Sequence, residues 1–89
     1  MIRKRIIFHG RVQGVGFRYR ARQAAGQAGC TGWVKNEYDG SVIMEIQGTR
    51  EAIERVLQEI NQWKYVRIER MEVVLLPVVP DERRFRAGY

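Results

Sequence analysis

One stretch constrains the fold of this chain more than any other. Residues 10–18 read Gly-Arg-Val-Gln-Gly-Val-Gly-Phe-Arg. An alternating apolar segment, residues 5–12, runs into this stretch, and an alanine-rich segment with helical spacing, residues 17–28, follows it. The order predicts a strand, a tight glycine loop and a helix. Gly14 and Gly16 can adopt positive φ, which would turn the N–H groups of the loop and of the first helical turn toward one point.

Such a loop predicts an anion-binding site. Arg18 stands where the loop meets the helix, and its planar fork of donors suits a phosphoryl group. On these residues alone, a tight turn without a ligand explains the glycines equally well. Two nucleotide-binding loops are excluded by spacing, because Tyr19 occupies the third glycine position of the dinucleotide fingerprint and no Gly-Lys-Ser/Thr closes a P-loop.

Composition narrows the class of protein. The chain has 89 residues, of which 45% are apolar, and we expect one domain spanning residues 1–89. Its net charge of +6 favours anionic partners. No apolar run approaches the roughly 18 residues of a membrane span, and no signal-peptide segment follows Met1. Cys30 is the single cysteine, predicted to be a small buried residue, and this fits a cytoplasmic location. Since the lone His9 has no cysteine cluster or second histidine beside it, we expect neither a metal ion nor a cofactor.

Strand and helix patterns alternate along the chain. Asp39-Gly40 marks a hairpin turn, and Thr49 can cap a second helix. A shift in apolar phase between Ile68 and Met71 predicts a β-bulge. The predicted strands cover residues 5–12, 30–36, 41–47 and 66–76, with a possible short edge strand at 85–89, and the predicted helices cover residues 17–28 and about 50–63.

This order, βαββαβ with a possible fifth strand, predicts a ferredoxin-like α+β sandwich with two helices on one face of an antiparallel sheet. Within residues 41–47 the apolar side chains are predicted to face the core, while Glu45 and Gln47 point to the open face. Asn36 ends a predicted strand beside a turn, where an asparagine either faces a site or simply forms the turn. The fold by itself implies no activity.

Two segments resemble the signatures of the acylphosphatase family. Residues 10–18 are similar to the segment that forms the phosphate loop of that family. Residues 32–36, Gly-Trp-Val-Lys-Asn, followed by Asp39-Gly40, resemble the second signature. The resemblance covers essentially the whole chain, in the same order and spacing. The chain departs from the family at residues 62–65, where a Gly-Pro pair is often found, and at Ala87, where a larger aliphatic residue is usual. The conformation of the first segment and the pairing of the last strand therefore stay open.

The resemblance implies an enzyme that hydrolyses the carboxyl–phosphate bond of a small acyl phosphate by direct attack of water, without a metal ion. A carboxylate leaving group, with a pKa near about 4, departs without a proton, so an acid–base pair is not needed. The expected competing anion is phosphate or sulfate, the expected state is a monomer, and no nucleic-acid or membrane partner is expected. The resemblance implies that Arg18 binds the phosphoryl group and that Asn36 orients the water. It also implies that the phosphoryl oxygens are held by the backbone N–H groups of Gln13, Gly14, Val15, Gly16 and Phe17.

Two other functions remain alternatives. An RNA-recognition module would share the fold and the positive charge, but residues 41–47 offer no aromatic side chain for base stacking and place Glu45 on the predicted open face. A carbamoyl-phosphate-handling domain, as in hydrogenase-maturation carbamoyltransferases, resembles acylphosphatase but is normally part of a much larger chain. Metal-free hydrolysis of an acyl phosphate by this chain would distinguish an acylphosphatase from an RNA-recognition module.

Overall fold

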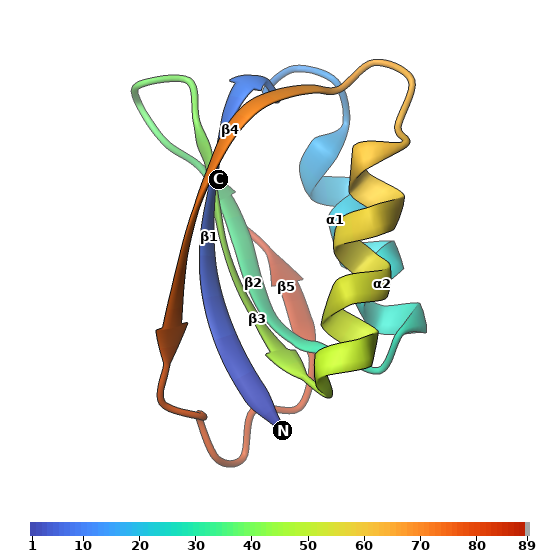
Figure 1. Cartoon of the computed structure of the whole chain (residues 1–89), viewed down its shortest axis with the longest axis vertical. Helices are drawn as coiled ribbons and strands as arrows, with labels where there is room; N and C mark the ends of the chain where they lie inside the picture. Colours follow the sequence, from blue (N-terminus) through green and yellow to red (C-terminus); the bar gives the residue numbers. More distant parts are fainter. Residues whose placement is uncertain (89) are drawn as a thin grey trace.

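The protein folds into a five-stranded sheet with two helices on one face (Figure 1). The computed structural model describes residues 1–88. Tyr89, the end of the predicted last strand, lies outside the described residues. The elements in chain order are β1 (Ile2–Arg11), α1 (Phe17–Gln27), β2 (Thr31–Asn36), β3 (Val42–Gly48), α2 (Arg50–Asn61), β4 (Arg67–Leu76) and β5 (Phe85–Ala87). The predicted ferredoxin-like α+β sandwich is confirmed. No helix within residues 1–88 is long and apolar enough to cross a membrane.

The strands lie in the order β4-β1-β3-β2-β5. The four longer strands pair antiparallel, as predicted. The short β5 instead pairs parallel to β2, with Phe85 opposite Gly32 and Ala87 opposite Val34, so the complete sheet is mixed. This parallel pairing carries the end of the described chain back toward the glycine loop.

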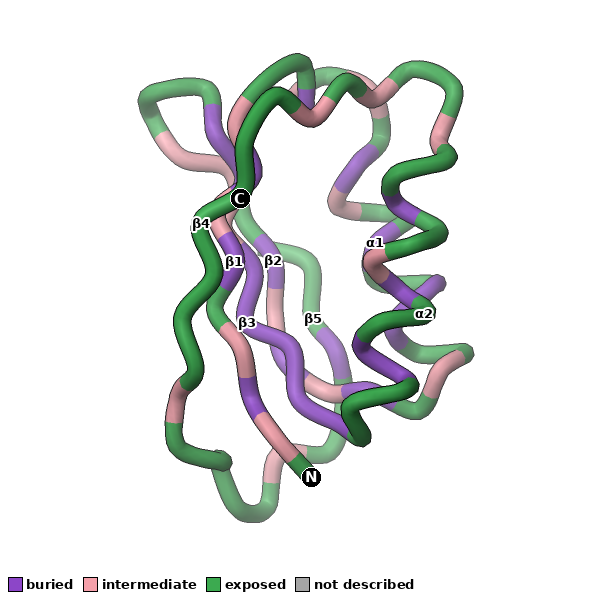
Figure 2. Tube along the Cα trace, in the orientation of Figure 1, coloured by how far each residue is buried: buried purple, intermediate pink, exposed green. Residues whose placement is uncertain are grey.

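The core lies between the sheet and the two helices. Figure 2 shows buried residues along the inner strands and along one side of each helix. Ile6 and Phe8 of β1, with the alternate apolar residues of β3, are fully buried on the face predicted for them. On α1 the buried stripe consists largely of alanine, which lets this helix lie close to the sheet. On α2 the buried residues are Ala52, Ile53, Val56 and Ile60.

Local signals set several element boundaries as predicted, although β1 begins at Ile2 and not at the predicted Arg5. The Thr49 hydroxyl accepts a hydrogen bond of 3.1 Å from the N–H of Ala52 and so caps α2. Gly29, with φ 75°, follows the last turn of α1 in the left-handed conformation. Cys30 is buried, 3% exposed, also as predicted. After α2, the chain makes two tight turns in which Trp63 donates to the Ile60 carbonyl and Val66 to the Trp63 carbonyl.

The predicted irregularity between Ile68 and Met71 is a β-bulge. His9 pairs with Arg70 and Gly10 pairs with Ile68, so Glu69 has no partner residue in β1. Gly10 has φ 129°, and a Cβ atom at this position would lie 2.2 Å from the backbone oxygen of Arg67. Only glycine fits this close approach of the two strands.

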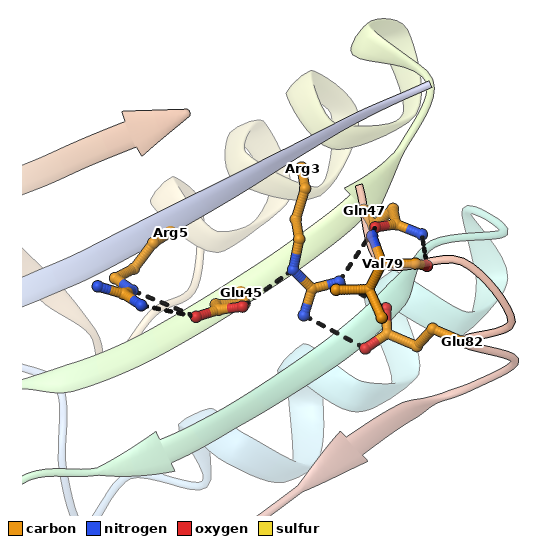
Figure 3. Close-up of polar contacts among 6 residues, drawn as sticks. All are labelled: Arg3, Arg5, Glu45, Gln47, Val79 and Glu82. Atoms are coloured by element: carbon orange, nitrogen blue, oxygen red, sulfur yellow. Dashed lines mark hydrogen bonds and ion pairs between the residues drawn. The ribbon is translucent and has the colours of Figure 1, made fainter. Parts of the chain in front are cut away.

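One prediction about the open face of the sheet is wrong. Glu45 and Gln47 are buried, 9% and 4% exposed, because the segment between β4 and β5 folds over them. Figure 3 shows Arg3 at the centre of this cluster. Its guanidinium donates hydrogen bonds of 2.9 Å to Glu45, 3.1 Å to Gln47 and 2.7 Å to Glu82. Gln47 in turn exchanges two hydrogen bonds with the backbone of Val79. Buried charge is stable here because each charged group has hydrogen-bonded partners of opposite sign.

Burial and pairing act in opposite directions on the charges of this cluster. Burial is the largest single influence on Glu82 and would raise its pKa. The hydrogen bonds from Arg3 and Thr31, together with the charges of Arg3 and Arg86, outweigh burial, so the pKa of this carboxyl lies below its usual value. Burial would likewise lower the pKa of Arg3, and its bonds to Glu82 and Glu45 raise it instead. Both groups therefore stay ionised, and the pair fastens the β4–β5 segment to β1 and β3.

Candidate active site

The glycine loop joins β1 to α1 and presents an uncapped helix start. Gly14 and Gly16 both adopt positive φ, 74° and 77°. Gly16 is the N-cap of α1 and, having no side chain, leaves the N–H groups of the first turn without a side-chain acceptor. The sequence permits this because glycine adopts the left-handed conformation without strain. Free N–H groups and the positive end of the helix dipole favour an anion at this position.

Gln13 ties the glycine loop to the β2–β3 hairpin. Its side-chain Nε2 donates hydrogen bonds of 2.8 Å to both the Glu37 and the Ser41 carbonyl oxygens. The side chain of Gln13 is therefore engaged in structure, which leaves its backbone N–H as the group that can face an anion. These two hydrogen bonds hold the glycine loop, which contains the first sequence signature, against the hairpin that contains the second.

The hairpin is itself rigidly built. The Asp39 carboxylate accepts hydrogen bonds of 2.6 Å from the Ser41 hydroxyl and 2.9 Å from the Ser41 N–H. These bonds lower the pKa of Asp39, and the bond from the Ser41 hydroxyl has the larger effect. Gly40 has φ 92°, as the predicted Asp-Gly turn requires. Asn36, the last residue of β2, pairs with Val42 and is half-buried beside this turn.

Arg18 lies in the first turn of α1 and is held by the other end of the described chain. Its Nη1 donates a hydrogen bond of 2.6 Å to the backbone carbonyl of Gly88. The neighbouring arginines of the helix, Arg20 and Arg22, are exposed and take part in none of the ion pairs among residues 1–88. Of the three arginines, Arg18 is the one that lines the pocket beside the glycine loop.

These elements surround a pocket of about 330 Å³. Its lining residues are Val12, Gly14, Gly16, Phe17, Arg18, Tyr19, Asn36, Ala87 and Gly88. The pocket therefore brings together Arg18 and Asn36, which are separate in sequence, with the two loop glycines. Of the described residues that line it, Arg18 is the one with a charged side chain, so the pocket is positive.

Two predicted loop residues do not line this pocket. Gln13 is directed to the hairpin, and Val15 packs against the core. Phe17 lines the pocket, but its ring is buried and contacts Phe8 and Trp63, with ring centroids 5.1 and 5.4 Å away. The ring thus anchors the start of α1 to the core. What Gln13, Val15 and Phe17 can offer an anion is their backbone N–H groups.

Four lining residues are outside the site predicted from the sequence: Val12, Tyr19, Ala87 and Gly88. Tyr19, 62% exposed, lines the mouth of the pocket and accepts a hydrogen bond of 3.0 Å from Gln23. Ala87 and Gly88 reach the pocket only because β5 pairs parallel to β2. A short edge strand could be predicted, but its direction depends on the path of the β4–β5 segment over the sheet.

The sequence model of the acylphosphatase family matches residues 4–87 of this chain. The chain belongs to the acylphosphatase family. The acylphosphatase of Geobacillus thermodenitrificans is 43% identical over 90 residues, a match that covers 100% of this chain and 96% of that protein. The match includes both sequence signatures and nearly the whole length of both proteins, as the resemblance implied.

Solved structures agree with this assignment. The crystal structure of acylphosphatase from Bacillus subtilis superposes with a TM-score of 0.91 at 32% identity, and the match covers 100% of both chains. The crystal structure of HypF from T. kodakarensis matches with a TM-score of 0.86 at 30% identity, covering 100% of this chain but 12% of that one. The acylphosphatase fold thus also occurs within a much longer protein.

Proposed function

We propose that the pocket at the start of α1 is the site where this acylphosphatase hydrolyses acyl phosphates. The observation that carries the proposal is the shared pocket of Arg18, Asn36, Gly14 and Gly16. It supplies one guanidinium, one amide and a set of loop N–H groups around a single volume. These are the groups that a phosphoryl transfer to water requires when the leaving group needs no assistance.

In the proposed reaction, Arg18 and the N–H groups of residues 13–17 hold the phosphoryl oxygens. Asn36 holds a water in line with the bond that breaks. The water oxygen forms a bond to phosphorus, while the bond from phosphorus to the carboxyl oxygen breaks and its electron pair leaves on the carboxylate. The proton of the water passes to the phosphate product or to solvent. Stabilisation of the equatorial oxygens by fixed donors lowers the barrier, since these donors need no reorganisation.

The leaving group explains why such a simple site suffices. A carboxylate, whose conjugate acid has a pKa of about 4, is stable on departure, whereas the alkoxide of a phosphate monoester is not. We therefore propose that the protein needs neither a general acid nor a metal ion and discriminates strongly against monoesters. The decisive experiment is hydrolysis of benzoyl phosphate by EDTA-treated protein, with an alkyl phosphate monoester as the control.

Turnover of benzoyl phosphate that survives EDTA, with no detectable turnover of the monoester, is the expected result. Loss of activity with EDTA and its recovery with an added divalent cation would contradict the metal-free mechanism. Equal turnover of both substrates would contradict the argument from the leaving group.

We also propose that inorganic phosphate and sulfate compete with the substrate, because both present the same oxygens to the same donors. Titration of ¹⁵N-labelled protein with phosphate should move the amide signals of Gly14, Gly16, Phe17 and Arg18. Unmoved signals under inhibiting phosphate concentrations would mean that the anion binds elsewhere. Competitive kinetics against benzoyl phosphate provide the second, independent measurement.

Three further proposals concern the oligomeric state, the domain organisation and the cellular location of the protein. We propose a monomer consisting of one domain, residues 1–89, that acts in the cytoplasm, where its single buried cysteine would stay reduced. Light scattering at micromolar concentration tests the monomer directly, and a mass of twice 10.5 kDa would contradict it.

A further inference from the structure

A second and larger cleft lies away from the glycine loop. It has a volume of about 480 Å³ and is bounded by β2, β5 and the segment between β4 and β5. Gly32 and Trp33 of β2 form one wall, residues 79–84 form the opposite wall, and Arg86 of β5 completes it. Its volume lies within the range of about 300–1,000 Å³ that is typical of small-molecule sites. The proposed reaction uses none of these residues.

The cleft carries an excess of positive charge. Arg83, Arg84 and Arg86 all line it, and none of the ion pairs among residues 1–88 involves them. The nearby carboxylates are already engaged: Glu82 binds Arg3, and Glu45 binds both Arg3 and Arg5 (Figure 3). Asp81 is the other carboxylate of the lining, so three arginines face one carboxylate that is not held by Arg3.

A flat apolar surface adjoins these charges. Trp33 projects from the open face of β2, on the same side as its cross-strand neighbour Glu45. It pairs with Arg86 across the parallel β2–β5 register. The ammonium group of Lys35 lies 5.6 Å from the centroid of the Trp33 ring. The tryptophan side chain is half-buried, so it is fixed in place and still reaches the cleft.

We propose that this cleft binds a nucleoside polyphosphate, with the base against Trp33 and the phosphates between Arg83, Arg84 and Arg86. Guanidinium groups bind phosphate oxygens in pairs, and several of them around one volume suit adjacent phosphates better than a single one. An aromatic ring accepts a nucleobase by stacking. A compact cluster of arginines beside one aromatic ring fits a single nucleotide, whereas an extended single strand requires several stacking platforms along the sheet.

The cleft and the glycine-loop pocket share one strand as their wall. Arg86 lines the cleft, while its neighbour Ala87 lines the pocket that contains Arg18. Successive side chains of a strand point to opposite faces, so the two sites lie back to back across β5. A nucleotide in the cleft can therefore bind together with phosphate at the glycine loop.

The test is an NMR titration of ¹⁵N-labelled full-length protein with ATP, without magnesium and with the glycine loop saturated by inorganic phosphate. The indole N–H of Trp33 and the amide signals of Arg84 and Arg86 should shift in a saturable manner. Adenosine and tripolyphosphate, titrated separately, should each bind more weakly than ATP. Tripolyphosphate binding as tightly as ATP would overturn the role of Trp33.

Matched variants locate the binding. The double variant Arg83→Gln/Arg86→Gln should raise the Kd for ATP at least about tenfold, the loss expected for charge-assisted hydrogen bonds. The control Arg20→Gln/Arg22→Gln removes the same charge from exposed positions of α1 and should change the Kd less than about twofold. Retained hydrolysis of benzoyl phosphate by both variants establishes that they are folded.

Three results would overturn the proposal. The first is the absence of any shift at millimolar ATP. The second is an equal loss of affinity in the two double variants, which would indicate a general effect of charge. The third is much tighter binding of a short single-stranded oligonucleotide than of ATP, which would replace the nucleotide by a nucleic acid.

Discussion

The guanidinium of Arg18 donates a hydrogen bond of 2.6 Å to the carbonyl of Gly88, 70 residues further along the chain. One N–H of the guanidinium is thus directed to backbone, and the others remain for a phosphoryl group. The planar shape of the group means that fixing one N–H also fixes the direction of the rest. An ammonium group would lack this property, because its donors rotate freely about the side chain.

We therefore predict that Arg18→Lys lowers kcat/KM for benzoyl phosphate by at least about a hundredfold, or about 2.7 kcal/mol. The charge is kept, but lysine lacks the planar fork of donors that can bind Gly88 and, as proposed, the phosphoryl oxygens together. Arg20→Lys, on an exposed position of the same helix, should be nearly neutral. Equal losses in the two variants would indicate an electrostatic patch instead of a specific site. Circular dichroism and urea unfolding confirm that both proteins are folded.

Asn36→Asp tests the proposed water-orienting group. The two side chains have the same shape, and aspartate also suits a position beside a turn, so stability should barely change. The variant loses the amide N–H donors and adds negative charge in the pocket where we propose that the phosphoryl group binds. Like charges about 4 Å apart at an effective dielectric of about 20 repel by about 4 kcal/mol before screening. We expect kcat to fall at least about a hundredfold.

Asn36→Ala is the companion variant. It should also be slow, but it should bind inorganic phosphate more tightly than Asn36→Asp because it adds no charge. Near wild-type turnover by a folded Asn36→Asp protein would show that this residue is only a turn-former.

The glycine loop of the candidate site could be predicted from the sequence, but the contact between Arg18 and Gly88 could not. The glycine loop could be predicted because its determinants are local: a strand pattern, two glycines and a helix pattern within residues 5–28. The Asp39-Gly40 turn, the Thr49 cap and the bulge opposite Gly10 are local signals of the same kind. The contact of Arg18 with Gly88 could not be predicted, since it depends on a parallel strand pairing between distant segments.

The buried polar cluster was missed for a related reason. Alternation predicts that Glu45 and Gln47 face solvent, and the strand predicted at residues 5–12 does not include Arg3, because β1 begins at Ile2. Their burial becomes favourable only when Glu82 arrives from residues 77–84. No pattern within β1 or β3 contains that information.

Gly10→Ala should destabilise the protein by about 3 kcal/mol or more, because the new Cβ would lie 2.2 Å from the Arg67 oxygen and φ is 129°. Gly26→Ala is the matched control. A Cβ at Gly26 meets no atom within 4 Å, and alanine in a helix is favoured over glycine by about 0.5–1 kcal/mol, so this variant should be stabilised. The free energy of unfolding in urea measures both. Similar stability of the two variants would contradict the close approach of β1 and β4.

Glu82→Gln should cost stability at neutral pH, by about 1–3 kcal/mol, since its carboxylate accepts charged hydrogen bonds from the buried Arg3. Glu54→Gln is the control, because the Lys4–Glu54 pair spans 3.9 Å with Glu54 half exposed and should contribute less than about 1 kcal/mol.

The pH dependence of the Glu82 contribution has a definite sign. The pKa of Glu82 is lower in the folded protein than its ordinary value of 4.5, so its contribution to the free energy of unfolding is fully present above that value. It is lost as the pH falls through the lower folded-state pKa. The difference between wild type and Glu82→Gln should therefore shrink on acidification below about pH 4, as followed by urea unfolding. A difference that stays constant down to pH 2 would contradict the Arg3–Glu82 pair.

If the proposed site is correct, the parallel docking of β5 also predicts when activity appears during folding. The glycine loop and α1 are complete once residue 27 has been made, but Arg18 gains its Gly88 partner only after β5 has joined β2. Closing such distant contacts is slow compared with forming a helix. During refolding, helical signal should therefore appear before hydrolysis of benzoyl phosphate, as stopped-flow circular dichroism and activity measurements would show.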